Sequence, residues 1–203
     1  MVRNSWLHNS QSTVLESLYA RVDAYGVCFS EAAGPVVRLV GGEHTFNQCT
    51  IANNYLFSAI YGPLLSLGHC LPEDALDCGL PLMRARFSNS IIYGLSGDIN
   101  TGDLTGSDVC FDYVSFKSTG SNDDWFRNCM WETDPMFLTD RPEYYFNYRL
   151  KPDSPVISAG NPDLVAPESV LDMDGLDRLS FGTPSLGAYQ FNPSAPLPDI
   201  DNQ

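Results

Sequence analysis

The chain of 203 residues can bury one substantial hydrophobic core, so a single domain with an appendage is the expectation. Hydrophobic residues make up 43% of it, which excludes a disordered chain. The formal net charge of −14 repels phosphate backbones and so excludes nucleic acid as an expected partner, whereas neutral glycans, cations and basic proteins stay compatible with it.

Glycine and proline are frequent, and they interrupt every apolar stretch. The 16 glycines and 14 prolines break up helices and favour short strands joined by turns. The stretch 44–72 carries no charged residue, but Asn53, Asn54 and Gly62-Pro63 divide it into short apolar runs, and a membrane-spanning helix needs roughly 20 apolar residues. We therefore predict no transmembrane segment. The opening "MVRNSWLHNS" also lacks the apolar region of a secretory signal.

A short phrase recurs along the first two thirds of the chain. It reads "YGVCFS", "FNQCTI", "FSNSII" and "FRNCMW", beginning at Tyr25, Phe46, Phe87 and Phe126. The interval from Phe46 to Phe87 reduces to that from Tyr25 to Phe46 when two insertions are removed, one on each side of Pro63. A period of about 20 residues with several short strands per repeat is typical of a solenoid, in which equivalent strands stack as parallel sheets.

Strand alternation predicts which residues of the second phrase share a face. Asn53 and Asn54, at the end of this strand, suit a sharp turn, because asparagine tolerates positive φ. The predicted faces are Asn47, Cys49 and Ile51 on one side, with Phe46, Gln48 and Thr50 on the other.

The spaced leucines of leucine-rich repeats are absent, and the expected strands favour Val, Ile, Phe and Cys. We therefore predict an all-β chain that forms a parallel β-helix. Residues 1–135 are expected to form the coils, and residues 136–192 a C-terminal segment that closes and caps them. Residues 193–203, rich in Pro and Asp, are expected to be a flexible tail.

Several phrases together resemble a known family. "HTFNQCTIANN" and "RFSNSIIYG" look like coil phrases, and they are followed in order by "DPMF", "NYRLKPDSPVISAG" and "LDMDGLDRLSFGTPSLGAYQ". From about residue 4 to residue 191 the chain resembles the C-terminal part of bacterial right-handed parallel β-helix proteins of the pectin-lyase-like superfamily. Its nearest likeness is to extracellular or surface-attached members of unassigned activity. The resemblance implies a right-handed β-helix, a C-terminal cap and an extracellular or cell-surface location.

The chain departs from this family at its beginning. "NSWLHNS" places Trp6 in the position that Cys28 takes in the next coil, so the chain begins inside a coil. Members of the family usually carry further coils and an export signal upstream. The expectation is therefore a fragment, or a first coil that a partner or a second copy covers, because an exposed sheet edge favours self-association.

The six cysteines show no metal-binding spacing. Cys70 and Cys78 both lie in the longer insertion, which predicts a disulfide that closes this loop, with two free thiols as the alternative. Cys28 and Cys49 are expected on neighbouring coils, where buried free thiols are the commoner arrangement and a disulfide is the alternative.

"DMDGLD" is the strongest candidate for a metal site. Alternating carboxylates around a glycine turn can surround Ca²⁺, and the candidate ligands are Asp172, Asp174 and Asp177. The spacing differs from that of an EF-hand, since glycine comes fourth and no glutamate follows at the twelfth position. The alternative is a turn in which these side chains accept bonds from their own backbone.

Evidence for catalysis in the sequence is weak, and we assign no catalytic residue. Asp123 and Asp124 resemble the paired aspartates of inverting polygalacturonases, but the accompanying motifs are absent and a solvated turn is the better interpretation. Arg38, Arg84 and Arg86 could supply the base of a lyase, yet no acidic cluster adjoins them in the sequence. Ordinary exposed strand positions are the expectation for all three arginines.

The remaining candidates favour structural roles. His8, His44 and His69 stand in no catalytic or metal-binding motif. The aromatic run 144–148, with Trp125 and Trp131, could stack on sugar rings, but covering the interior of the last coil is the favoured role.

The sequence thus favours a non-catalytic extracellular or cell-surface β-helix scaffold that binds glycans or a surface partner, with no cofactor unless the aspartates hold Ca²⁺. The alternative is a polysaccharide lyase or glycoside hydrolase, which only the likeness to the superfamily supports. A groove with clustered carboxylates and a basic residue on one sheet would favour the enzyme.

Overall fold

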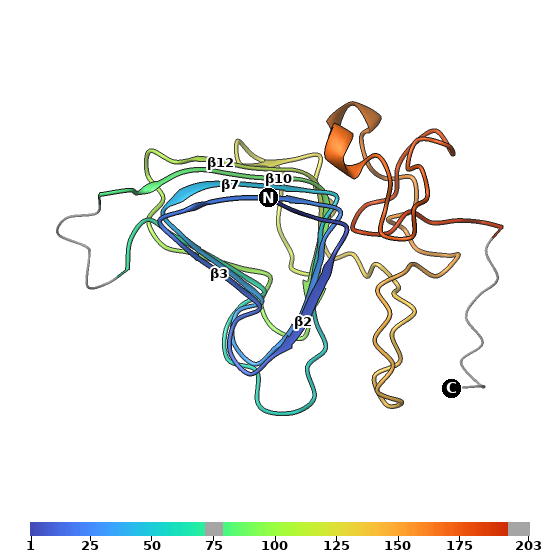
Figure 1. Cartoon of the computed structure of the whole chain (residues 1–203), viewed down its shortest axis with the longest axis horizontal. Helices are drawn as coiled ribbons and strands as arrows, with labels where there is room; N and C mark the ends of the chain where they lie inside the picture. Colours follow the sequence, from blue (N-terminus) through green and yellow to red (C-terminus); the bar gives the residue numbers. More distant parts are fainter. Residues whose placement is uncertain (72–78, 195–203) are drawn as a thin grey trace.

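The protein is nearly all β-structure, and most of its strands run parallel. The computed structural model describes residues 1–71 and 79–194. Figure 1 shows strands that curl round a common interior, with successive passes of the chain stacked on one another. The only helical elements in the described part are two short 3₁₀ turns, η2 (Pro162–Leu164) and η3 (Pro167–Ser169). The predicted parallel all-β architecture is therefore confirmed in a solenoid-like form that is compatible with a β-helix.

Two parallel sheets form the walls. The smaller sheet has the order β11-β9-β6-β3, and the larger runs β1-β4-β7-β10-β8-β5-β2, with β12 on β10 and β13 on β12. The long strand β10 pairs with β7 through its first half and with β8 through its second, because it continues through a bend that divides the earlier coils. The strands of the smaller sheet are β3 (Leu15–Leu18), β6 (Val37–Val40), β9 (Leu65–Gly68) and β11 (Ile99–Thr101). Those of the larger sheet are β1 (Val2–Arg3), β2 (Trp6–Ser10), β4 (Arg21–Tyr25), β5 (Cys28–Ala32), β7 (Gly42–Asn47), β8 (Thr50–Asn53), β10 (Leu82–Gly94), β12 (Asp108–Phe116) and β13 (Phe126–Arg127).

A residue with positive φ stands at the same bend in every coil. The strand registers place these residues above one another, and asparagine and glycine predominate because they adopt this conformation most easily. The bend residues are Asn4, Gly26, Gln48, Asn89, Tyr113 and Asn128. The positive φ expected of Asn53 and Asn54 is absent from both residues, and the left-handed bend of this coil lies at Gln48 instead.

This bend also changes the predicted inner and outer faces. A left-handed residue interrupts the strict alternation of a strand. Across the bend, two side chains therefore point to the same face when two residues separate them, whereas in a regular strand one residue separates them. Phe46, Cys49 and Ile51 consequently all enter the main core, while Asn47 faces the C-terminal segment. The expectation that Asn47 shares a face with Cys49 is wrong for this reason.

In the first coils, residues that pair on adjacent strands are one residue further apart in the sequence than the recurring phrases are. The reason is that Ala24, and not Tyr25, pairs with Phe46. Cys28 lies beside Trp6 on one side, as predicted, and beside Thr50 on the other. Cys28 and Cys49 are thus not equivalent positions. Cys49 belongs to the main core inside the coils, whereas Cys28 belongs to a second core cluster on their outer face. Both thiols are free and buried, as the favoured interpretation held.

Stacked phenylalanines run through the main core. Ring centroids lie 4.9 Å apart for Phe46 and Phe87, 4.8 Å for Phe87 and Phe111, and 4.9 Å for Phe111 and Phe126. Phe111 belongs to a coil that the repeat analysis missed, because its phrase "CFDYVSF" has no asparagine or cysteine at the expected places. Trp131 stacks on Phe116 at 4.8 Å and so shields the last coil, as predicted.

The C-terminal segment lies along one side of the coils (Figure 1). A second core cluster joins it to the outer face of β5, β8 and the second half of β10, through Cys28, Ala52 and Ile91. The residues that the segment contributes are Phe137, Tyr148, Leu150, Val156, Leu186, Ala188 and Tyr189. Within the described residues, no helix has the length and apolar character needed to cross a membrane.

Replacing Phe87 by alanine should lower the free energy of unfolding by about 3–5 kcal/mol, because the change removes the middle of the aromatic stack and leaves a cavity. Chemical denaturation followed by circular dichroism measures this loss. Phe181→Ala is the matched control, since Phe181 is 44% exposed and its truncation should cost well under about 1 kcal/mol. Equal losses in the two variants would contradict the assigned core.

Candidate functional site

Two asparagines of the recurring phrases attach the C-terminal segment to the coils. The Asn47 side chain donates to the carbonyl of Leu164 at 2.7 Å and accepts the Ser169 hydroxyl at 2.6 Å. The Asn89 amide donates to the carbonyl of Asn161 and accepts its N–H, both at 2.8 Å. A primary amide offers both donors and acceptors, which suits it to pairing with backbone in this way.

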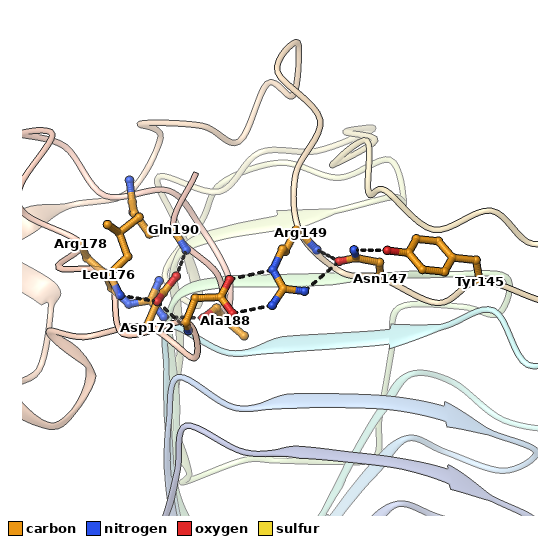
Figure 2. Close-up of polar contacts among 9 residues, drawn as sticks. Tyr145, Asn147, Arg149, Asp172, Leu176, Arg178, Ala188 and Gln190 are labelled. Atoms are coloured by element: carbon orange, nitrogen blue, oxygen red, sulfur yellow. Dashed lines mark hydrogen bonds and ion pairs between the residues drawn. The ribbon is translucent and has the colours of Figure 1, made fainter. Parts of the chain in front are cut away.

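The three predicted metal ligands make separate contacts, and Figure 2 shows those of Asp172. Asp172 is buried, and its carboxylate accepts the backbone N–H groups of Asp174, Leu176 and Gln190, each at 2.8 Å. Asp174 instead forms an ion pair with Arg149, with Nε 2.7 Å from Oδ2. Asp177 accepts the N–H of Leu179 at 2.8 Å.

The bonds of Asp172 and Asp177 match the alternative interpretation of "DMDGLD", in which aspartates close turns of their own backbone, whereas Asp174 pairs with Arg149 instead. No group of three or more His, Cys, Asp or Glu side chains among the described residues is arranged to hold a metal ion. Calcium binding stays a prediction that the geometry does not favour.

Replacing Asp172 by asparagine should lower the free energy of unfolding by about 1–3 kcal/mol, because the amide cannot accept all three backbone N–H groups and one of them loses its partner. Thermal unfolding with and without calcium measures this, and the loss should be the same in both conditions. Asp177→Asn is the milder control, since that residue accepts one bond at an exposed turn. A rise in Tm with calcium that Asp172→Asn abolishes would establish the metal site instead.

Arg178 lies fully buried beside this turn and anchors the chain end. Its guanidinium donates to the carbonyls of Ser169 at 2.9 Å, Gly187 at 3.1 Å and Ala188 at 2.7 Å. Burial lowers the pKa of Arg178 to about 10, while the nearby Asp172 carboxylate acts in the opposite direction. The group therefore stays charged at neutral pH and serves a structural role.

A buried glutamate joins three segments where the coils meet the C-terminal segment. Glu31 has a positive φ of 60° and is almost fully buried. Its carboxylate accepts the hydroxyl of Tyr148 and, at 3.1 Å, the backbone N–H of Asn54. Burial raises the pKa of Glu31 to about 7, and the bond from Asn54 and the charge of Arg141 offset this only in part.

The raised pKa makes stability depend on pH. Between about pH 4.5 and 7 the unfolded chain loses the Glu31 proton while the folded chain keeps it, so the free energy of unfolding falls, by up to roughly 3 kcal/mol. As the pH rises through this range, the protein should lose stability relative to its Glu31→Gln variant, which has no proton to lose at this position. Tyr148→Phe should move the window to higher pH, because the carboxylate loses a donor. A constant difference from pH 4 to 8 would refute the assignment.

A cleft of about 280 Å³ opens next to this glutamate, between the coils and the C-terminal segment. Burial raises the pKa of Tyr93, and the Asp134 carboxylate that accepts its hydrogen bond raises it further. Arg141 donates from Nε to the carbonyl of Asn54 at 3.3 Å. The lining residues are Asn54, Tyr93, Asp134, Met136, Phe137, Thr139, Arg141 and Lys151. Six of these residues lie between positions 134 and 151, but no pattern there indicates a cleft, because Asn54 and Tyr93 come from distant parts of the chain.

Two exposed aromatic side chains lie on the segments that supply Asn54 and Arg141 to the cleft wall. Phe57 is 63% exposed and Tyr144 is 64% exposed, and their ring centroids lie 6.4 Å apart. Phe57 follows the cleft residue Asn54 by three positions, and Tyr144 follows Arg141 in the same way. Tyr144 belongs to the run 144–148, whose other members include Tyr148, which packs inward on Phe137 at 5.0 Å. The predicted role of covering the interior of the last coil is therefore wrong for Tyr148, which packs against the outer face of the coils, and Tyr144 is exposed.

The strand arginines have carboxylate partners on neighbouring coils. Arg84 forms an ion pair with Glu43 at 3.0 Å, and Arg86 forms one with Asp108, all on β7, β10 and β12. Arg38 pairs with a glutamate on β3 in the same manner. No acidic cluster adjoins these arginines in the sequence, and their carboxylate partners come from adjacent strands, because stacking brings together residues that the sequence separates by one pass of the chain.

The other candidates fill structural positions. Asp123 accepts the backbone N–H groups of Trp125 at 2.8 Å and Phe126 at 2.9 Å, so it closes the expected turn before a strand. His44 is buried, with Nε2 2.8 Å from the carbonyl of Gly41. Cys70 forms a disulfide. Cys78 lies outside the described residues, so the Cys70–Cys78 pairing stays a prediction.

His8 and His69 also have neighbours that account for them. The His8 ring packs on Trp6 at 4.4 Å, and His69 Nε2 lies 3.2 Å from the carbonyl of Thr105. Of the residues singled out from the sequence as candidates for chemistry, the structure therefore brings none to the cleft.

No protein-family model, curated protein or solved structure matches the chain.

Proposed function

We propose that the protein is a non-catalytic scaffold of the extracellular space or cell surface, which binds glycans through the aromatic pair Phe57 and Tyr144. In this proposal its curled sheets are a right-handed parallel β-helix, related to the C-terminal part of bacterial pectin-lyase-like proteins. The observation that carries the proposal is the contact between two highly exposed aromatic rings, on the segments that also supply Asn54 and Arg141 to the cleft.

The aromatic pair has the chemistry of a sugar platform. Large exposed apolar groups that gather on a surface mark interaction sites, since burying them against a ligand is favourable. A pyranose ring offers an apolar C–H face to such rings and hydroxyl groups at its rim. Asn54 and Thr139, which line the cleft, are polar groups of the kind that orient a bound ligand.

The ion pairs on the outer strands support a non-catalytic function. A guanidinium that is bonded to a carboxylate holds its proton more firmly, and the pKa of Arg86 is raised by its bond to Asp108. A lyase that uses arginine as a base needs the opposite shift. Each of these arginines is better suited to holding neighbouring coils together.

One observation favours an enzyme as the second candidate. Arg84 and Arg86 share an outer face with Glu43 and Asp108, so basic and acidic groups do gather on one sheet. A polysaccharide lyase or hydrolase would release unsaturated products or new reducing ends from a glycan, and Arg86→Gln would abolish the release. Absence of both products from acidic and neutral polysaccharides would eliminate this candidate.

The aromatic pair can be tested by glycan binding. On a glycan array followed by isothermal titration, Phe57→Ala and Tyr144→Ala should each weaken binding of a retained glycan by about tenfold or more, because each removes half of the platform. Phe181→Ala, an exposed aromatic change in another part of the C-terminal segment, should leave binding unchanged. Retention of no glycan, or equal losses in all three variants, would overturn the proposal.

A further inference from the structure

We infer that the cleft between the coils and the C-terminal segment is a binding site for a small monoanionic carboxylate. The inference concerns Arg141 and Lys151, which line the cleft, and it does not rest on glycan binding by the aromatic pair. Charge, geometry and size each contribute to it.

The two cations of the cleft have no carboxylate partner among the described residues. Five other arginines form ion pairs there, namely Arg21, Arg38, Arg84, Arg86 and Arg149. The chain has 25 acidic residues against 11 basic ones, so a surface cation on it has many candidate partners. Arg3 and Arg127 also have no such partner in the described part, but neither lines the cleft. Two unpaired cations in one cleft of an acidic protein form a local site for an anion.

The guanidinium of Arg141 is held with its terminal nitrogens unused. Nε donates to the carbonyl of Asn54, and no bond from the two terminal nitrogens to a described residue is present. A planar guanidinium fixed on one side presents a fork that matches the two oxygens of a carboxylate. Lys151 adds a second, flexible donor on the cleft wall.

The remaining groups favour a single negative charge on the ligand. Asp134 also lines the cleft, so Arg141, Lys151 and Asp134 together leave a net charge of about +1, which the nearby Glu31 lowers further to the extent that it is ionised. A monoanion neutralises this charge, whereas a dianion such as a phosphate monoester would bring an unpaired charge close to Asp134. The Asp134 carboxylate accepts the backbone N–H of Met136 at 2.8 Å, which holds it in place.

The size and walls of the cleft favour a small ligand. A volume of about 280 Å³ lies just below the range of roughly 300–1,000 Å³ of sites for drug-sized molecules. Phe137 and Met136 supply an apolar wall. A carboxylate on one ring or on a short chain therefore fits both the charge and the space.

Benzoate is a suitable probe, with benzamide as its neutral analogue and phenyl phosphate as its dianionic analogue. In isothermal titration of the full chain, benzoate should bind at least tenfold more tightly than either analogue. Lys151→Gln and Arg141→Gln should each weaken benzoate binding by tenfold or more. Arg127→Gln, which removes an unpaired arginine outside the cleft, should leave the affinity unchanged.

The outcomes separate this inference from the proposed function. Phe57→Ala should weaken glycan binding without changing benzoate affinity, so either site can fail alone. Equal binding of benzoate and benzamide, or full affinity in Lys151→Gln, would overturn the inference. If Arg141→Gln perturbs the fold, Lys151→Gln still tests the inference, because the Lys151 amine makes no bond to a described residue.

Discussion

The structure depends on one backbone constraint, the left-handed residue that stands at the same bend of each coil. It turns the chain within the larger sheet, for example between β7 and β8, and it also shifts the alternation of inward and outward side chains by one position. That shift puts Phe46 and Cys49 into the same core and leaves Asn47 directed outward. Asn47 and the bend residue Asn89 are then available to bind the backbone of the C-terminal segment. A conformational requirement of the solenoid thus creates the docking surface for the segment that covers it.

Attachment of that segment creates the cleft as well. The coil side contributes Asn54 and Tyr93, and the segment contributes Asp134, Arg141 and Lys151, so the cleft exists only when the two parts are packed together. Asn54 bonds to Glu31 through its N–H and to Arg141 through its carbonyl. The protonation of a buried acid is therefore coupled through one residue to the cation that faces the cleft.

The repeat could be predicted because it leaves a direct signal in the sequence: a phenylalanine opens three of the four recurring phrases, and Trp6 and Cys28 take equivalent positions. The exact register could not, because "YGVC" and "FNQC" align Tyr25 with Phe46 by their letters, while the backbone pairs Ala24 with Phe46. The coil at Phe111 escaped for a similar reason, since it keeps the interior ring and changes the letters around it. In this coil the buried ring is kept, whereas the residues at the bend beside it differ from those of the other phrases.

The candidate site could not be predicted, and the reason is physical. Outer charges in a solenoid meet across coils, so the partners of Arg84 and Arg86 lie on strands that the sequence separates. The same stacking explains why two cations without partners are informative. Arg38, Arg84 and Arg86 find their carboxylates on the next coil, whereas Arg141 and Lys151 lie on the C-terminal segment, outside the stacked strands. Neither of these two cations forms an ion pair with a described residue, so both are available to the carboxylate of a ligand.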